Sequence, residues 1–153
     1  MIRLLRPFTA YEFHVYNPGG PVPTSGRTAH IQIKGLSRRG FQEDFADCAG
    51  VICNAGFELP SETLHHGKKL LVKPLHRQME QLSNALALEQ LRLGEVMREL
   101  DPATLASWLA TDQAHMVRYP DVAGAVAEWL LRGDLNIDQS WIEAIWQRAR
   151  KVA

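Results

Sequence analysis

Short apolar runs alternate with amphipathic segments through the first two thirds of the chain. Five runs have the length and composition of β-strands, at 12–17, 30–34, 50–54, 69–74 and 94–97. Between them, apolar residues at helical spacing predict helices at 41–48, 60–66 and 82–91. Gly67 fits a C-cap of the second helix, and the Pro- and Gly-rich segment 17–26 predicts a loop. Alternating strands and helices predict an α/β fold with a parallel, doubly wound sheet.

The pattern is helical throughout from residue 99 onward. Asp101 and Pro102 have the identities of an N-cap and a first helical residue, and further helices are predicted at 122–132 and 139–152. Aromatic residues mark the apolar faces of this region, namely Trp108, Tyr119, Trp129, Trp141 and Trp146. Their default role is core packing, with a contact surface as the alternative. We expect one domain over 1–153, with an α/β portion at 1–98 and a helical tail at 99–153.

Charge and cysteine content exclude several classes of protein. Seventeen basic and seventeen acidic residues cancel, so no overall field favours nucleic acid or an anionic membrane as a partner. Cys48 and Cys53 form neither a CxxC motif nor a disulfide framework, which indicates free thiols in a reducing compartment. No segment has the pattern of a signal peptide or a membrane span. We therefore expect a cytoplasmic protein.

The junction from Val51 to Glu62 is the most informative stretch for function. It has the pattern of a buried strand, a turn at Gly56 and the start of a helix. A helix start offers unpaired N–H groups and the positive end of the helix dipole to an anion. The junction therefore fits a phosphate site, although every α/β protein has junctions of this kind.

A second polar cluster follows the fourth predicted strand, on the same rim of the expected sheet. It consists of Gln78, Glu80, Gln81 and Asn84. Such side chains bind sugar hydroxyls, because each donates or accepts hydrogen bonds at fixed geometry. Alone, the cluster fits an ordinary solvated helix start better. Two polar clusters on one rim favour a binding site.

Together the two clusters resemble the donor-binding signature of the GT-B glycosyltransferases. The matching pieces are Asn54-Ala55-Gly56-Phe57, Glu62, Gly67, the strand Lys69-Leu70-Leu71-Val72-Lys73-Pro74 and the run Glu80-Gln81-Leu82-Ser83-Asn84-Ala85. From about residue 8 to 146 the chain is similar to a bacterial and archaeal glycosyltransferase family. From 41 to 85 its spacing is also similar to the UDP-glycosyltransferases and to the lipid-linked N-acetylglucosaminyltransferase of cell-wall synthesis. The resemblance implies the Rossmann-like C-terminal half of a GT-B enzyme.

The resemblance also implies a role for individual residues. Glu62 would bind both ribose hydroxyls of a nucleotide, and the turn of Asn54, Ala55, Gly56 and Phe57 would hold the diphosphate. The transferred sugar would contact Glu80 and Gln81, with Gln78 and Asn84 as secondary candidates. Backbone groups near Phe41 and Gln42 would bind uracil. The pattern departs from relatives at Asn54, where many have His, and at Glu80, where Asp is more frequent.

The implied donor is a UDP-sugar, bound as a substrate and without a cofactor. Helix N–H groups can stabilise a leaving diphosphate without a metal. The sequence has no Asp-x-Asp motif, and His65-His66 lies at a predicted helix end, where the dipole favours imidazoles.

Only half of a GT-B enzyme is matched. The acceptor site and usually the catalytic base lie in an N-terminal domain, so the catalytic residues are unknown. The resemblance also implies a further strand in the sheet, between the strands at 13–17 and 51–54. In the family this strand comes before the one at 13–17, where this sequence has only residues 2–8. Because a central gap leaves backbone groups unpaired, we expect that Met1 is an internal start and that the gap is repaired. The expected repairs are pairing by residues 2–8, closure of the sheet, or dimerisation.

The leading hypothesis is the UDP-sugar-binding half of a glycosyltransferase that transfers a hexosyl group. One alternative is a non-catalytic fragment or subunit that needs a separate acceptor-domain partner or a second copy. Another is a protein related to the sugar-nucleotide epimerases.

Overall fold

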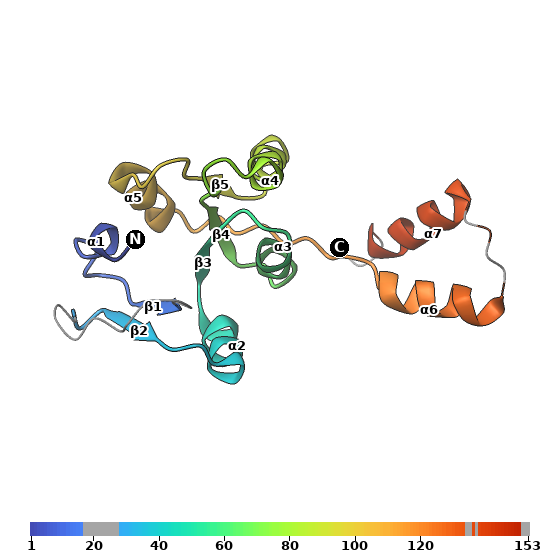
Figure 1. Cartoon of the computed structure of the whole chain (residues 1–153), viewed down its shortest axis with the longest axis horizontal. Helices are drawn as coiled ribbons and strands as arrows, with labels where there is room; N and C mark the ends of the chain where they lie inside the picture. The colour runs from blue at the N-terminus through green and yellow to red at the C-terminus, as the bar shows by residue number, and fades with distance from the viewer. Residues whose placement is uncertain (17–27, 134–135, 137, 151–153) are drawn as a thin grey trace.

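The computed structural model describes residues 1–16, 28–133, 136 and 138–150 and has an α/β fold (Figure 1). In chain order its elements are α1 (Ile2–Leu5), β1 (Phe13–Tyr16), β2 (Ile31–Lys34), α2 (Arg38–Asp47), β3 (Gly50–Cys53), α3 (Glu58–His65), β4 (Lys69–Val72), α4 (Met79–Gln90), β5 (Glu95–Val96), α5 (Pro102–Ala110), α6 (Val122–Arg132) and α7 (Gln139–Arg150). All paired strands are parallel. The predicted α/β class with a helical tail is confirmed, whereas the predicted loop at 17–26 lies outside the described residues.

Helix ends match the sequence pattern where a capping residue marks them. Asp101 accepts hydrogen bonds from the N–H groups of Ala103 and Thr104 at the start of α5. Gly67 has a φ of +62°, as expected after a helix. Three helices begin earlier than predicted, because their first residues do not share the apolar period of the rest of the helix. In α2, for example, the helix starts at Arg38 with Ser37 as its N-cap.

β4 is the central strand of a three-stranded sheet with the order β3–β4–β5. Leu71 points to one face, where it packs with Trp108 of α5. Leu70 and Val72 point to the other face and pack with residues of α3 and α4 such as Ala85. Figure 1 shows α5 on one side of this sheet and α3 and α4 on the other. The double cover explains why all three side chains are buried.

The expected single sheet is present as two separate sheets. Within the described residues, β1 pairs only with β2, and β3 pairs only with β4. Residues Ile2–Leu5 form a helix, so this segment does not pair as a strand, and the two sheets do not close up. Two of the expected repairs are therefore wrong, and dimerisation stays a prediction. β3 is also half-buried rather than buried, because no strand of the described ranges lies along its outer edge.

The C-terminal end of α5 contacts the amino ends of both sheets. Tyr11, just before β1, donates its hydroxyl to the Leu109 carbonyl at 3.2 Å. Gly50, the first residue of β3, lies so close to the Trp108 ring that an added Cβ would be 2.9 Å from it. Lys69, the first residue of β4, donates to carbonyls of Trp108, Leu109 and Thr111. β1, β3 and β4 therefore all begin near the C-terminal end of α5, and β3 and β4 run parallel.

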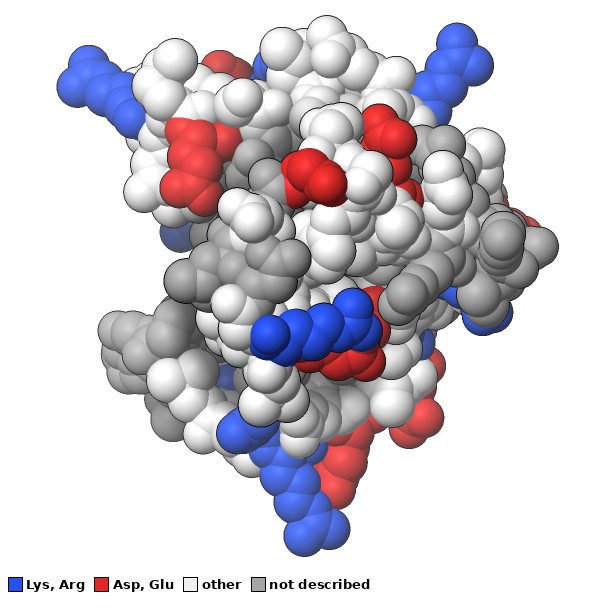
Figure 2. All heavy atoms as spheres, turned by 90° about the vertical axis from the view of Figure 1, so that its right-hand side faces the viewer, with Lys and Arg blue, Asp and Glu red and all other residues white. Residues whose placement is uncertain are grey.

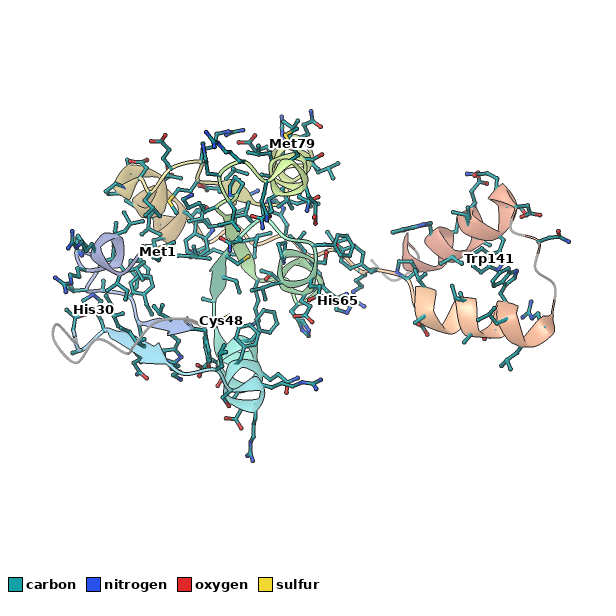
Figure 3. All side chains as sticks on the ribbon, in the orientation of Figure 1. Met1, His30, Cys48, His65, Met79 and Trp141 are labelled. Carbon is teal, nitrogen blue, oxygen red and sulfur yellow. The ribbon has the colours of Figure 1, made fainter. Side chains whose placement is uncertain are left out.

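α6 and α7 form a helical pair that Figure 1 shows apart from the sheets. The rings of Trp129 and Trp141 lie 6.1 Å apart between the two helices, where Figure 3 labels Trp141. Ile145 is buried beside them, whereas Trp146 remains 48% exposed. The predicted core packing is thus found where α6 and α7 face each other, whereas the outer side of the pair is exposed to solvent. Trp108 belongs instead to the core under the sheet.

Candidate functional site

A large cleft lies between the two sheets, and we call it the central cleft. Its volume is about 2060 Å³. Its walls are formed by β1 and β3 and by residues of the helices α1, α2 and α5. Met1 and Cys48, both labelled in Figure 3, are part of its lining. At the carboxyl end of β3 the cleft reaches the junction that the sequence singled out.

The start of α3 is open to a ligand. No side chain caps this helix, whose N-cap residue is Phe57. In the described ranges, the N–H groups of Phe57, Glu58 and Leu59 have no hydrogen-bond partner, and Pro60 has no N–H. Asn54, Gly56 and Phe57 line the cleft at this point. The geometry is that of an anion-accepting helix start at the carboxyl end of a parallel strand.

Two charged residues that the sequence analysis missed line the same part of the cleft. Lys73 follows β4 directly, and its ammonium is 3.4 Å from the Pro74 carbonyl, its only hydrogen-bond partner in the described part of the chain. Glu58 is the first residue of α3. Lys73 had a signal in the sequence, because a lysine after an apolar strand and before a proline stands at the ligand-binding end of a parallel sheet. The structure thus adds one cation to the lining of the cleft that the open helix start also reaches.

The second polar cluster meets the rim at the start of α4. Glu80 lines the cleft, whereas Gln81 accepts a hydrogen bond from the Leu75 N–H at 2.9 Å. Asn84 donates from its amide to the Ala55 carbonyl at 3.1 Å and so ties α4 to the β3–α3 turn. Gln78 is exposed at the N-cap of α4. The structure therefore brings Glu80 to the turn and gives Gln81 and Asn84 positions that support the two loops.

The remaining candidates lie farther out. Glu62 is exposed on α3, one turn beyond the open helix start, and is not part of the cleft lining. Phe41 lines the cleft, with its ring edge-on to Tyr16 and stacked on Phe45. Gln42 is exposed outside the lining. The roles of these residues in binding stay predictions.

A partly buried ionic network holds β1 and β2 against α2. Asp44 of α2 accepts hydrogen bonds from Lys34 at 2.8 and 2.6 Å and from the Tyr16 hydroxyl at 2.6 Å, and His14 Nδ1 lies 2.9 Å from it. The hydrogen bonds from Lys34 and Tyr16 lower the pKa of Asp44 from 3.8 to about 2. Burial, followed by the bond to Asp44, raises the pKa of Tyr16 from 10.0 to about 12. The network stabilises the two-stranded sheet only while Asp44 is charged and Tyr16 is protonated.

The two pKa shifts predict a pH dependence of stability. A carboxyl with a lowered pKa stabilises the fold above its ordinary pKa, so the contribution of Asp44 is lost as pH falls from about 4 to about 2. Because the pKa of Tyr16 is raised, its protonated hydroxyl stabilises the fold below pH 10, and this contribution is lost as pH rises from about 10 to about 12. We expect the difference in Tm between the wild type and Asp44→Asn to shrink between pH 5 and 2. A difference that stays constant over this range would contradict the assignment, and Tyr16→Phe provides the matching alkaline control.

Other polar features of the described residues give no alternative site. His65 stacks on Tyr119, and His66 contacts the Phe45 ring. The described ranges contain no group of three His, Cys, Asp or Glu side chains placed to hold a metal. Figure 2 shows both signs of charge scattered over one face, without a continuous patch of either sign. No helix in the described part of the chain is long and apolar enough to cross a membrane.

Parallel strands, alternating helices and an open helix start at a strand's carboxyl end define a Rossmann-like α/β domain. Comparison with known families then gives a specific match. Residues 1–111 match the family described as glycosyl transferase family 1, and the chain belongs to this family. Searches of curated proteins and of solved structures returned no match.

Proposed function

We propose that this chain is the nucleotide-sugar-binding half of a glycosyltransferase, with a UDP-sugar as its donor. Family membership supports glycosyl transfer in general. The proposal rests chiefly on the residues that line the central cleft near the carboxyl ends of β3 and β4, namely the open start of α3, Lys73 and Glu80. Such a rim has an anion-binding end and a hydroxyl-binding end, as a sugar diphosphate requires.

The diphosphate binds at the start of α3. The N–H groups of Phe57, Glu58 and Leu59 donate to phosphate oxygens, and Lys73 supplies a full positive charge. During glycosyl transfer, negative charge develops on the leaving diphosphate, and oriented donors stabilise it. Asn54, exposed at the end of β3, adds a side-chain amide. No metal ion is part of the proposed site.

The sugar and the nucleoside lie on opposite sides of the diphosphate. Glu80 accepts hydrogen bonds from hydroxyls of the transferred sugar, while Gln81 and Asn84 hold the loops around it. Glu62 accepts from the ribose hydroxyls, which places the nucleoside along the exposed side of α3. Uracil then approaches the first turn of α2 near Phe41 and Gln42. The acceptor site and the catalytic base belong to a second domain, so the chain alone binds the donor without efficient turnover.

Calorimetry with UDP, UDP-hexoses, GDP and TDP tests this proposal. We expect UDP and at least one UDP-hexose to bind the wild type. Glu62→Ala should weaken both by about 1.5–3 kcal/mol, the value of a charged hydrogen-bonding contact. Glu99→Ala is the matched control, because Glu99 is also an exposed glutamate but follows β5 instead of lying on α3.

Equal affinity of Glu62→Ala and the wild type would remove the ribose assignment. Absence of binding by every nucleotide would remove the proposed function itself. The affinity of Glu80→Ala for UDP and for the UDP-hexose tests the sugar contact separately. Only binding of the UDP-hexose should weaken, because UDP carries no sugar for Glu80 to contact.

A further inference from the structure

α4 is apolar on two opposite sides. Its inner side carries Ala85 and Leu88, which are buried in the core over the β3–β4–β5 sheet. Its outer side carries Met79, Leu82 and Leu86, which are 77, 43 and 49% exposed. These three positions are separated by three and four residues, so they lie in one row along the helix. Because a helix that is apolar all round is normally covered all round, the outer row requires a partner.

No charged side chain interrupts this outer side of α4. Its other exposed positions are uncharged, namely Ser83, Ala87 and Gln90, and we call the six residues together the α4 stripe. The two acids of α4 face elsewhere. Glu80 lines the central cleft, and Glu89 accepts two hydrogen bonds of 2.7 Å from Arg98. Figure 3 labels Met79 on the outer side of the helix.

A free arginine lies just beyond each end of α4. Arg77 comes shortly before Met79, the first residue of the helix, and Arg92 comes shortly after Gln90, the last. Both arginines are exposed, and within the described residues neither side chain has a hydrogen bond or an ion pair. They are also the non-glycine residues of the described ranges with a positive φ, at +62° and +55°. Glycine or asparagine adopts this conformation more readily, so the backbone alone does not explain arginine at both positions.

An apolar stripe with a cation at each end is complementary to a bilayer surface that contains anionic lipids. Apolar side chains enter the boundary between headgroups and acyl chains, and arginines attract the lipid phosphates. Because the chain has no net charge, such attraction has to come from a local arrangement. The upper edge of Figure 2, the side on which Figure 1 shows α4, has uncharged atoms between two projecting basic side chains. A folded protein would need a groove shaped to α4, whereas lipids adapt to a single helix face.

We propose that the α4 stripe is a membrane-contact surface, through which the protein binds reversibly to bilayers that contain anionic lipids. α4 lies parallel to the bilayer surface, with Met79, Leu82 and Leu86 inserted among the headgroups. The helix is about 18 Å long, so Arg77 and Arg92 contact different lipids. Twelve residues are too few to cross a bilayer, and the contact requires no membrane-spanning helix.

Sedimentation of the whole chain with lipid vesicles tests this surface. The vesicles consist of phosphatidylcholine, alone or with about 30 mol% phosphatidylserine. We expect the wild type to bind the anionic vesicles at least about tenfold more tightly than the neutral ones. Leu82→Gln/Leu86→Gln should bind the anionic vesicles at least about tenfold more weakly, because two apolar side chains no longer enter the lipid. Leu130→Gln/Leu131→Gln is the matched control, since both leucines are exposed on α6.

Arg77→Asn and Arg92→Asn test the two charges. Asparagine tolerates the left-handed conformation, so these variants should fold like the wild type. Each should bind the anionic vesicles about fivefold more weakly, with binding to phosphatidylcholine unchanged. Arg132→Asn is the control, because Arg132 is an exposed arginine on α6.

The methionine methyl groups report which surface meets the lipid. In NMR spectra of the chain with ¹³C-labelled methionine, a lipid with a nitroxide in its acyl chain should broaden the Met79 signal. The Met116 signal should stay sharp, although Met116 is 58% exposed, because it lies beside Gly67 and away from α4. Met97, which is buried, gives the reference signal.

Four outcomes would overturn the proposal. The first is no binding to the anionic vesicles, and the second is equal binding by Leu82→Gln/Leu86→Gln and the wild type. The third is broadening of Met116 as strong as that of Met79, which would place another surface against the lipid. The fourth is a dimer in light scattering that Leu82→Gln/Leu86→Gln dissociates, which would assign the α4 stripe to a second copy. Since UDP binding is measured without lipid, failure here leaves the donor-site proposal intact.

Discussion

Leu71→Ala is expected to lower the free energy of unfolding by about 2–5 kcal/mol, the range for deleting a large aliphatic side chain from a core. Leu71 has no exposed surface and lies in the middle of β4. It packs with Leu5, Leu105 and Trp108, which come from α1 and α5. The cavity left by alanine would lie where both helices cover the sheet, so several elements would have to move to fill it.

Urea unfolding followed by circular dichroism measures this loss. Leu36→Ala is the control, because Leu36 is 73% exposed and the same truncation there should change stability by about 0.5 kcal/mol or less. Equal losses in the two variants would show that the face of β4 toward α5 is not a packed core.

Lys69→Met is expected to lower the free energy of unfolding by about 2–4 kcal/mol, because several backbone carbonyls would lose a charged donor at once. The ammonium of Lys69 donates to carbonyls of Trp108, Leu109 and Thr111 at 3.2, 3.3 and 2.6 Å, and lies 4.9 Å from the centroid of the Trp108 ring. A cation at a helix C-terminus also interacts favourably with the dipole. Methionine keeps most of the apolar stem but carries no charge, so it can neither donate to these carbonyls nor form a cation–π interaction with the ring.

Lys73→Met, at the residue just after the same strand, is the matched control for Lys69→Met. The Lys73 ammonium makes a single long hydrogen bond to the adjacent carbonyl, so the change should cost less than about 1 kcal/mol. The same variant should weaken UDP binding, whereas Lys69→Met, if it folds, should not. A stability loss as large in Lys73→Met as in Lys69→Met would contradict the bridging role of Lys69.

Local signals were sufficient for most elements of the fold. The bounds of α6 follow from the sequence because Asp121 caps its start and Gly133, with a φ of +69°, ends it. The start of α4 was missed because Gln78, Met79 and Glu80 carry no apolar period. The division into two sheets could not be derived from periodicity, since Val-Ile-Cys in β3 has the composition of a strand with neighbours on both sides. Strand pairing depends on which segments meet, and composition does not report that.

The sequence predicted where the candidate site lies, but it did not predict the hydrogen-bond partners of the side chains there. Strand ends followed by helix starts place Asn54, Gly56 and Glu80 on one rim, where the structure also has them. The partner of a polar side chain is not fixed by its identity. The Gln81 carbonyl oxygen and the Asn84 amide are engaged by backbone groups of Leu75 and Ala55, which only the three-dimensional arrangement determines.

The hydrogen bond from Asn84 to the Ala55 carbonyl has a consequence for affinity. It joins the helix start proposed for the sugar to the turn proposed for the diphosphate. If the proposed donor binds here, its two contacts are held at a fixed separation before it arrives. Such preorganisation would reduce the entropy lost on binding, so that the sugar and the diphosphate contacts reinforce each other.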